Sequence, residues 1–122
     1  MTYMLLTYLD EKAWLSLSEA ERQQIIAEPM QYVEQLIASG KFLGGAPLEP
    51  TSTASTVRVR DGKPLVTDGP FAETREQVAG YTLIDAQDRD EAIAIATRFL
   101  GTSIYPIIEI QAVAQERGVP TH

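Results

Sequence analysis

Strand-like and helix-like segments alternate along this chain, and their order limits the folds that it can form. Two segments with helical spacing of apolar residues, 18–40 and 88–101, each lie between runs rich in β-branched and aromatic residues. An Asp61-Gly62 pair separates two further β-prone runs, which is a strong signal for a two-residue hairpin. The order predicts an α+β fold: a ferredoxin-like βαββαβ sandwich with an extra β-hairpin in its middle.

Several local signals predict where these elements begin and end. Ser18 and Glu21 have the spacing of a capping box, and the run from Asp88 to Glu91 predicts a second helix start. Pro29 falls inside the first helical pattern, so we expect a kink or a division into two helices there. The main strands are expected over 3–9, 77–85 and 104–113, segment 41–48 mainly as a turn, and 74–77 as a helical turn.

The hairpin pattern also predicts a register. A two-residue loop at Asp61-Gly62 places Arg58 opposite Leu65 and Val57 opposite Val66. Pro64 lacks a backbone N–H, so this strand is expected at a sheet edge.

The composition of the chain argues against several kinds of scaffold and active site. The 122 residues fit one domain, expected over 1–113, with a tail over 114–122. There is no cysteine, and the single histidine is His122, which argues against a disulfide scaffold, a thiolate metal site and a Ser-His-Asp triad. No cofactor is expected.

Charge and hydropathy argue against nucleic acid and membranes as partners of this chain. The formal net charge of −7 repels phosphate backbones, so nucleic acid is not an expected partner. No apolar run has the length of a membrane span, and the N-terminus lacks the pattern of a secretory signal. We therefore expect a cytoplasmic protein without a membrane partner.

One motif has a family resemblance. Asp68-Gly69-Pro70-Phe71, continued by Ala72-Glu73-Thr74-Arg75-Glu76-Gln77, resembles the signature of the DGPF-motif branch of the YCII-related family. Segments 3–6, 56–63, 80–85 and 90–92 are also similar to that branch, so the resemblance covers roughly residues 1–113. It implies a ferredoxin-like fold that dimerises into an α/β barrel, and an association with sigma-factor regulation.

The resemblance also implies a difference in chemistry. Some members of the wider family have been proposed to use a His-Asp pair in a cleft. Pro29 occupies the position of that histidine here, and Thr97 lies near the position of the aspartate. Because neither side chain can replace the pair in proton transfer, neither role is carried over to this chain.

Two carboxylates are candidate acid/base groups. Asp68 can line a ligand cleft with Phe71, or it can cap a turn while Phe71 fills the core. Glu109 shares a strand face with Tyr105 and Gln111, and burial of that face in a dimer would raise its pKa and favour a general base. The alternative for Glu109 is a solvated or hydrogen-bonded structural residue.

Arginines and tyrosines supply the candidate binding groups. Arg58 and Arg60 point the same way and can hold an anion, or they form the solvated face of an edge hairpin. Tyr81, like Tyr3 and Tyr8, can donate a hydrogen bond in a cavity, or it packs at a half-buried position. The candidate ligand-binding residues are therefore Tyr81, Phe71, Arg58 and Tyr105, and no metal ligand is expected.

Three functions fit these observations. The leading hypothesis is a small homodimeric protein that binds a small molecule or serves as an accessory protein without catalysis. The dimer is expected because an open sheet with helices on one face leaves its other face to be covered by a second copy. The second hypothesis is a cofactor-independent enzyme that uses Asp68 and Glu109, with Tyr81 positioning the substrate. The third is an interaction partner of a transcription regulator.

Overall fold

The computed structural model describes residues 1–100 and 106–114, and the order of its elements is the predicted one with additions. Within these residues the strands are β1 (Thr2–Asp10), β2 (Phe42–Pro47), β3 (Ser55–Arg60), β4 (Lys63–Asp68), β5 (Glu76–Asp85) and β6 (Ile107–Ala112). The helices are α1 (Glu11–Leu15), α2 (Glu19–Ala38) and α3 (Arg89–Leu100), with a 3-10 turn η1 (Thr51–Thr53). The predicted last strand, 104–113, begins outside the described residues.

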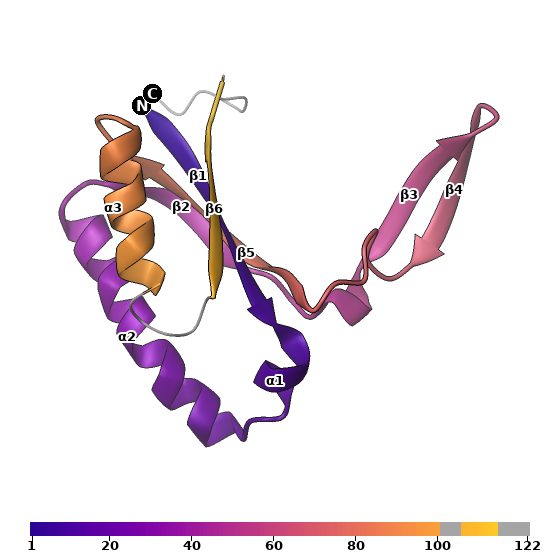
Figure 1. The fold of residues 1–122 in the computed structure, drawn as a ribbon, viewed down its shortest axis with the longest axis horizontal. Coiled ribbons are helices and arrows are strands. Elements are labelled where there is room, and N and C mark those ends of the chain that lie inside the picture. The colour runs from indigo at the N-terminus through magenta and orange to yellow at the C-terminus, as the bar shows by residue number, and fades with distance from the viewer. Residues whose placement is uncertain (101–105, 115–122) are drawn as a thin grey trace.

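Four strands form the main sheet in the order β2-β5-β1-β6 (Figure 1), and each neighbouring pair is antiparallel. The two central strands, β1 and β5, are neighbours, and the edge strands β2 and β6 flank them. This is the ferredoxin-like arrangement of two βαβ halves, so the predicted α+β fold class is confirmed.

Both long helices lie on one face of the main sheet (Figure 1). Every second residue of β1 points to that face, and Tyr3, Leu5 and Thr7 are at most 6% exposed there. Tyr3 and Leu5 pack in a core with Leu36 of α2 and Phe99 of α3. We call the opposite face the open face; strand register places on it Met4, Leu6, Tyr8, Tyr81, Leu83, Ile107, Glu109 and Gln111.

The predicted helix starts are present. Ser18 and Glu21 form both hydrogen bonds of a capping box, and the Asp88 carboxylate accepts from the Glu91 N–H at 2.9 Å. However, α2 continues through Pro29 as one helix, so the predicted division into two helices is wrong. The cap at one end and the burial of Pro29 and Leu36 against the fold offset the hydrogen bond that proline cannot make.

Two segments differ from the sequence prediction because contacts distant in the chain decide them. Segment 41–48 is mainly strand β2 rather than a turn, since it pairs with β5. Residues 74–77 form no helical turn, because β5 already begins at Glu76. The side-chain amide of Gln77 donates to the backbone oxygens of Ala72 and Thr74 instead.

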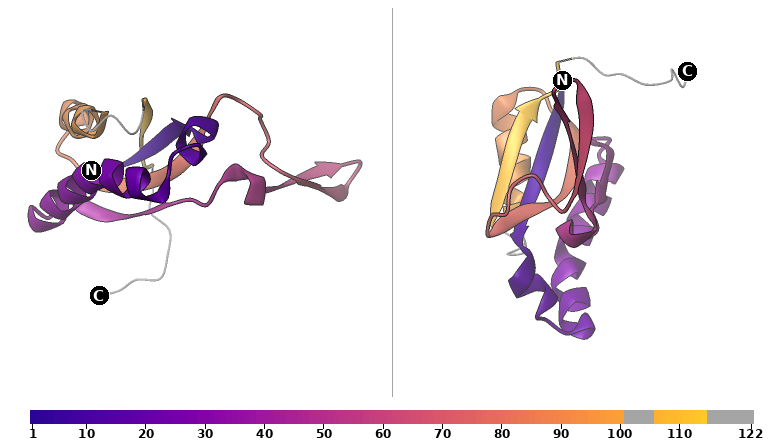
Figure 2. Two further views of the ribbon diagram at one scale, coloured as in Figure 1. Left: turned by 90° about the horizontal axis from the view of Figure 1, so that it is seen from below. Right: turned by 90° about the vertical axis from the view of Figure 1, so that its right-hand side faces the viewer.

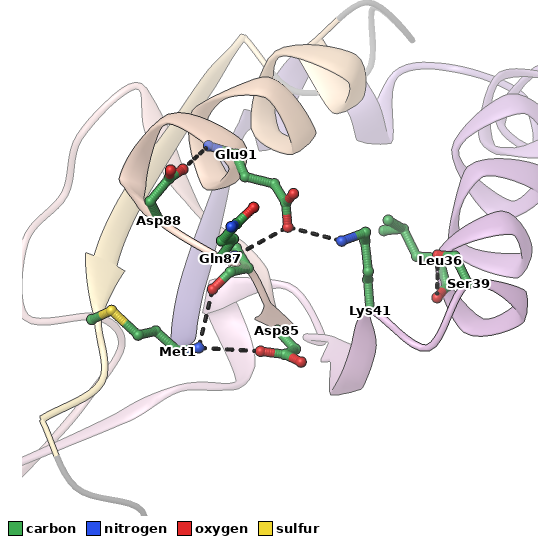
Figure 3. A network of polar contacts seen from close by, with 9 residues as sticks. Met1, Leu36, Ser39, Lys41, Asp85, Gln87, Asp88 and Glu91 are labelled. Carbon is green, nitrogen blue, oxygen red and sulfur yellow. Dashed lines mark hydrogen bonds and ion pairs between the residues drawn. The ribbon is translucent and has the colours of Figure 1, made fainter.

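A polar network joins the ends of several elements (Figure 3). The Lys41 ammonium group lies 2.8 Å from the Glu91 carboxylate, which also accepts from the backbone N–H of Gln87. The Met1 amino group contacts the Asp85 carboxylate at 3.2 Å. These contacts connect β1, β2, β5 and α3 at one end of the sandwich.

Strands β3 and β4 form a separate two-stranded sheet, which we call the arm (residues 55–68). Figure 2 shows the arm projecting away from the helices and the main sheet. Its register confirms the prediction, with Val57 opposite Val66 and Arg58 opposite Leu65. The turn residues Asp61 and Gly62 have φ values of 53° and 76°, as a type I′ hairpin requires.

No helix within the described residues has the length and apolar character needed to cross a bilayer.

Candidate functional site

An apolar hollow lies at the base of the arm beside Pro70 and Phe71, and we call it the arm-base cleft. Its volume is about 640 Å³. Tyr8 from the end of β1 and Val78 from the start of β5 form one side, while Pro70 and Phe71 border the other. The segment from Leu48 to Ala54 supplies further lining residues. Two loops that are distant in sequence therefore meet the main sheet here.

A tyrosine–carboxylate pair lies where this cleft meets the open face. The Tyr8 hydroxyl donates a hydrogen bond of 2.7 Å to Glu109. This bond, followed by partial burial and the negative charge of Glu109, raises the pKa of the Tyr8 phenol. Glu109 is exposed in the single chain, so its carboxylate is accessible both to solvent and to a molecule covering the open face.

The DGPF segment places its aromatic residue at the surface. Phe71 is 77% exposed and borders the arm-base cleft, so the expectation that it fills the core is wrong. The Arg58 guanidinium lies 5.3 Å from the centre of the Phe71 ring, which is a cation–π distance. Phe71 precedes β5 in a stretch without helix or strand.

The two predicted carboxylates belong to different sheets. Asp68 ends β4, is exposed, and pairs with Ser55 in the arm. Glu109 lies in β6 of the main sheet and pairs with Leu6. Phe71 lines the arm-base cleft. Glu109 lies beside the cleft because it accepts the hydrogen bond of Tyr8, which also lines it. Asp68 is not among the lining residues. Tyr105 lies outside the described residues.

A second hollow, the helix cleft, lies between α2 and the β2–β5 side of the main sheet. Its volume is about 330 Å³. The lining side chains are mainly apolar; Tyr81 borders the cleft as a residue of β5, but strand register directs its side chain to the open face. The lining residues are Thr7, Ile26, Pro29, Met30, Val33, Phe42, Gly45, Ala46, Pro47, Gly80, Tyr81, Thr82 and Phe99.

Polar groups in the helix cleft are largely satisfied internally. The buried Thr7 hydroxyl donates to the Gly80 carbonyl at 3.2 Å. Pro29, at the position where the resemblance implies a histidine, is buried and borders the cleft. The Thr97 hydroxyl donates to the Ile93 carbonyl of its own helix at 2.8 Å. The helix cleft therefore has no proton-transfer group at Pro29, where the resemblance implies a histidine, and Thr97 is not among its lining residues.

Sequence reasoning did not identify the helix cleft. Its walls come from residues that resemble ordinary core positions, such as Val33, Phe42 and Phe99. The available signal was the pair of glycines at 45 and 80, which leave the sheet surface without side chains beneath α2. Among residues 1–100 and 106–114, no cluster of three or more metal-ligating side chains is present.

Fold and clefts together define a small ferredoxin-like α+β domain with one cleft at the base of its arm and another between α2 and the main sheet. The chain belongs to the YCII-related domain family, whose sequence profile matches residues 1–111. An uncharacterised protein of Rhizobium meliloti (strain 1021) is 38% identical over 96 residues, which cover 79% of this chain and 77% of that protein.

A solved structure shares the fold. The 5-chloro-2-hydroxyhydroquinone dehydrochlorinase of Burkholderia phenoliruptrix AC1100, in complex with 2,5-dihydroxybenzoquinone, matches with a TM-score of 0.55. The match covers 95% of this chain and 96% of that chain, at 14% sequence identity. At this identity the similarity establishes a shared fold alone.

Proposed function

We propose that this protein binds a small, largely apolar molecule in the helix cleft and performs no proton transfer on it there. The observation that carries the proposal is the lining of that cleft, which is mainly apolar and, among the described residues, includes no aspartate, glutamate, histidine, lysine or arginine. Ligand pockets are mostly apolar, with a few polar groups that fix orientation. A site for acid/base chemistry needs a positioned side chain that exchanges protons near neutral pH, and the described lining residues of this cleft provide none.

The size of the cleft suggests the class of ligand. Its volume of about 330 Å³ lies at the lower end of the range for small-molecule pockets, roughly 300–1,000 Å³. An apolar cavity of about 150 Å³ can hold benzene. A compound with one substituted ring therefore fits the helix cleft. The dehydrochlorinase with the same fold was solved with a compound of this size, 2,5-dihydroxybenzoquinone, which supports testing phenols and quinones first.

Two exposed side chains on α2 provide a matched test. Met30 is 57% exposed and borders the helix cleft, whereas Ile37, two turns further on, is 55% exposed and is not among its lining residues. Met30→Trp should fill the mouth of the cleft, and Ile37→Trp adds the same bulk elsewhere. Binding of single-ring phenols and quinones is measured by calorimetry and by NMR shift perturbation.

The expected result is binding to the wild-type protein and to Ile37→Trp, and a loss of at least about tenfold in affinity in Met30→Trp. NMR shifts should concentrate on lining residues such as Val33 and Phe42. Equal affinity in all three proteins, or shifts confined to the arm-base cleft, would contradict the proposal.

A second candidate function is acid/base chemistry in the arm-base cleft. The 2.7 Å pair of Tyr8 and Glu109 favours it, because a carboxylate oriented by a hydroxyl can act as a general base. A second copy over the open face would shield the Glu109 carboxylate from water. Glu109→Gln should then abolish turnover of a substrate without preventing its binding, whereas unchanged turnover would exclude this role. The homodimer, the sigma-factor setting and the cytoplasmic location remain predictions.

A further inference from the structure

A third hollow lies where the short helix α1 meets the start of α2 and the segment that follows β2, and we call it the α1 cleft. Its volume is about 250 Å³. Figure 1 shows α1 directly after β1, at the end of the sheet where α2 begins. The side chains that matter for its chemistry are Glu11, Trp14, Leu15, Ile26, Leu48 and Glu49. Among the described residues that line it there is no lysine, arginine or histidine.

One face of α1 forms a wall of this cleft. Glu11, Trp14 and Leu15 are three and four residues apart, which is the spacing of neighbours on a helix surface, and all three line the cleft. Lys12 is exposed and is not among the lining residues. The Asp10 side chain caps the first turn of α1, so the direction of this face is set where β1 ends.

Hydrogen bonds hold the opposite wall in place. The Glu11 carboxylate accepts from the backbone N–H of Thr51 at 2.8 Å and also from the Thr51 hydroxyl. The Leu48 N–H donates to the Ala79 carbonyl of β5 at 2.7 Å. Segment 47–51 is therefore tied both to α1 and to β5, and the cleft between them is formed without a ligand.

The α1 cleft combines negative charge with an aromatic ring. None of the ion pairs among the described residues involves Glu11 or Glu49, whereas Asp10 close by pairs with Arg75 at 3.1 Å. Within the same part of the chain, neither cation–π contact uses the Trp14 ring. Two carboxylates and an indole without a cation of their own are complementary to a cationic ligand.

The remaining walls favour one kind of cation. Leu15 and Leu48 are 53% and 51% exposed, and together with Ile26 they present carbon atoms to the cleft. A primary ammonium group has three N–H donors to satisfy, and Glu11 already accepts two hydrogen bonds from Thr51. A methylated ammonium group has its charge under methyl groups, so apolar contact, an aromatic face and nearby negative charge are sufficient to hold it.

We propose that the α1 cleft binds a small methylated ammonium compound, with the ammonium group on the Trp14 ring and with Glu11 and Glu49 balancing its charge. A cavity of about 150 Å³ can hold benzene, so the α1 cleft accommodates a trimethylammonium group with a short chain. This ligand class differs from the neutral ring compounds proposed for the helix cleft.

Choline and 3,3-dimethylbutan-1-ol form a matched pair of probes, because the alcohol has carbon in place of the charged nitrogen. Trp14 is the single tryptophan of the chain, so its fluorescence reports binding at the α1 cleft itself. We expect choline chloride to change the emission saturably, with a dissociation constant of about 10 mM or lower. Sodium chloride at the same concentration should leave the emission unchanged. The alcohol should bind at least about tenfold more weakly than choline.

Three variants assign the interaction to named side chains. Glu49→Gln removes a lining carboxylate, whereas Glu28→Gln removes the same charge from an exposed position of α2 outside the cleft. Calorimetry should show a loss of choline affinity of about threefold or more in Glu49→Gln and a change of less than about twofold in Glu28→Gln. Trp14→Leu should weaken choline binding about fivefold or more, and should weaken binding of the alcohol less. Circular dichroism confirms that the variants are folded.

Three results would each overturn the proposal. They are the absence of a saturable fluorescence change up to about 100 mM choline, equal affinity for choline and the alcohol, and equal effects of the two glutamate variants. Binding in the helix cleft is tested with other compounds and with Met30→Trp, and Met30 does not line the α1 cleft. Each of the two proposals can therefore fail while the other holds.

Discussion

Replacing Gly45 by alanine tests how closely β2 approaches β5 in the wall of the helix cleft. A Cβ atom built on Gly45 would lie 2.5 Å from the Tyr81 carbonyl oxygen and 3.0 Å from the Thr82 Cα. Both atoms belong to the backbone of β5, so no side-chain rotation relieves the contact. The neighbouring Gly44 provides the control, because a Cβ there meets no atom within 4 Å.

The contacts set the expected magnitudes. Forcing β2 away from β5 is an overpacking change, which typically costs about 1–3 kcal/mol of unfolding free energy. For a chain of 122 residues this corresponds to a fall in Tm of about 3–6 °C for each kcal/mol. Gly44→Ala should instead leave stability unchanged or raise it by up to about 1 kcal/mol, since alanine reduces the entropy of the unfolded chain.

Urea denaturation followed by circular dichroism measures both free energies, and a thermal scan measures both Tm values. Displacement of β2 also changes the wall of the helix cleft, so Gly45→Ala should weaken binding of any ligand found there. Equal stabilities for the two variants would refute the inferred close approach of these strands. A large loss in Gly44→Ala would refute it equally.

Two further predictions concern titration. The Tyr8 phenol should ionise above the usual tyrosine range, and Glu109→Gln should bring its pKa back toward that range in an ultraviolet titration. Because the pKa is raised in the folded state, the hydrogen bond of Tyr8 contributes stability below the usual tyrosine range. That contribution is lost as pH rises through the folded pKa. Hydrogen bonds, first from Lys41 and then from the Gln87 N–H, lower the pKa of the Glu91 carboxyl, so its contribution is present above the usual glutamate range and is lost as pH falls through the folded value. Glu91→Gln should therefore flatten the acid limb of stability against pH, and an unchanged limb would contradict this role.

Local signals predicted the parts of the fold that depend on neighbours in sequence. The capping box at Ser18, the cap at Asp88 and the Asp61-Gly62 turn are all present. Each of these is decided by hydrogen bonds or dihedral angles within a few residues, so the sequence contains all the information needed. The arm register followed directly from the length of the turn.

The sequence prediction was incomplete at three places where the surroundings in the fold decide the structure. The segment with Gly44-Gly45 has weak β propensity, and it is a strand because β5 lies beside it. The short helix α1, whose Asp10 cap accepts from the Ala13 N–H, is too brief to show apolar periodicity. Phe71 shows the same limit, since its hydrophobicity predicted burial and its place at the base of the arm exposes it.

The two clefts separate binding from chemistry in a way that experiments can distinguish. The helix cleft has Pro29 where the resemblance implies a histidine, so a ligand held there meets no proton-transfer group at that position. The arm-base cleft has Tyr8 and, through it, Glu109, but it is open in the single chain. If a second copy covers the open face, the environment of Glu109 changes on dimerisation while the helix cleft, on the other face of the sheet, stays as it is. Ligand affinity that is independent of the dimer would then place binding in the helix cleft, and affinity or turnover that appears only with the dimer would place it beside Glu109.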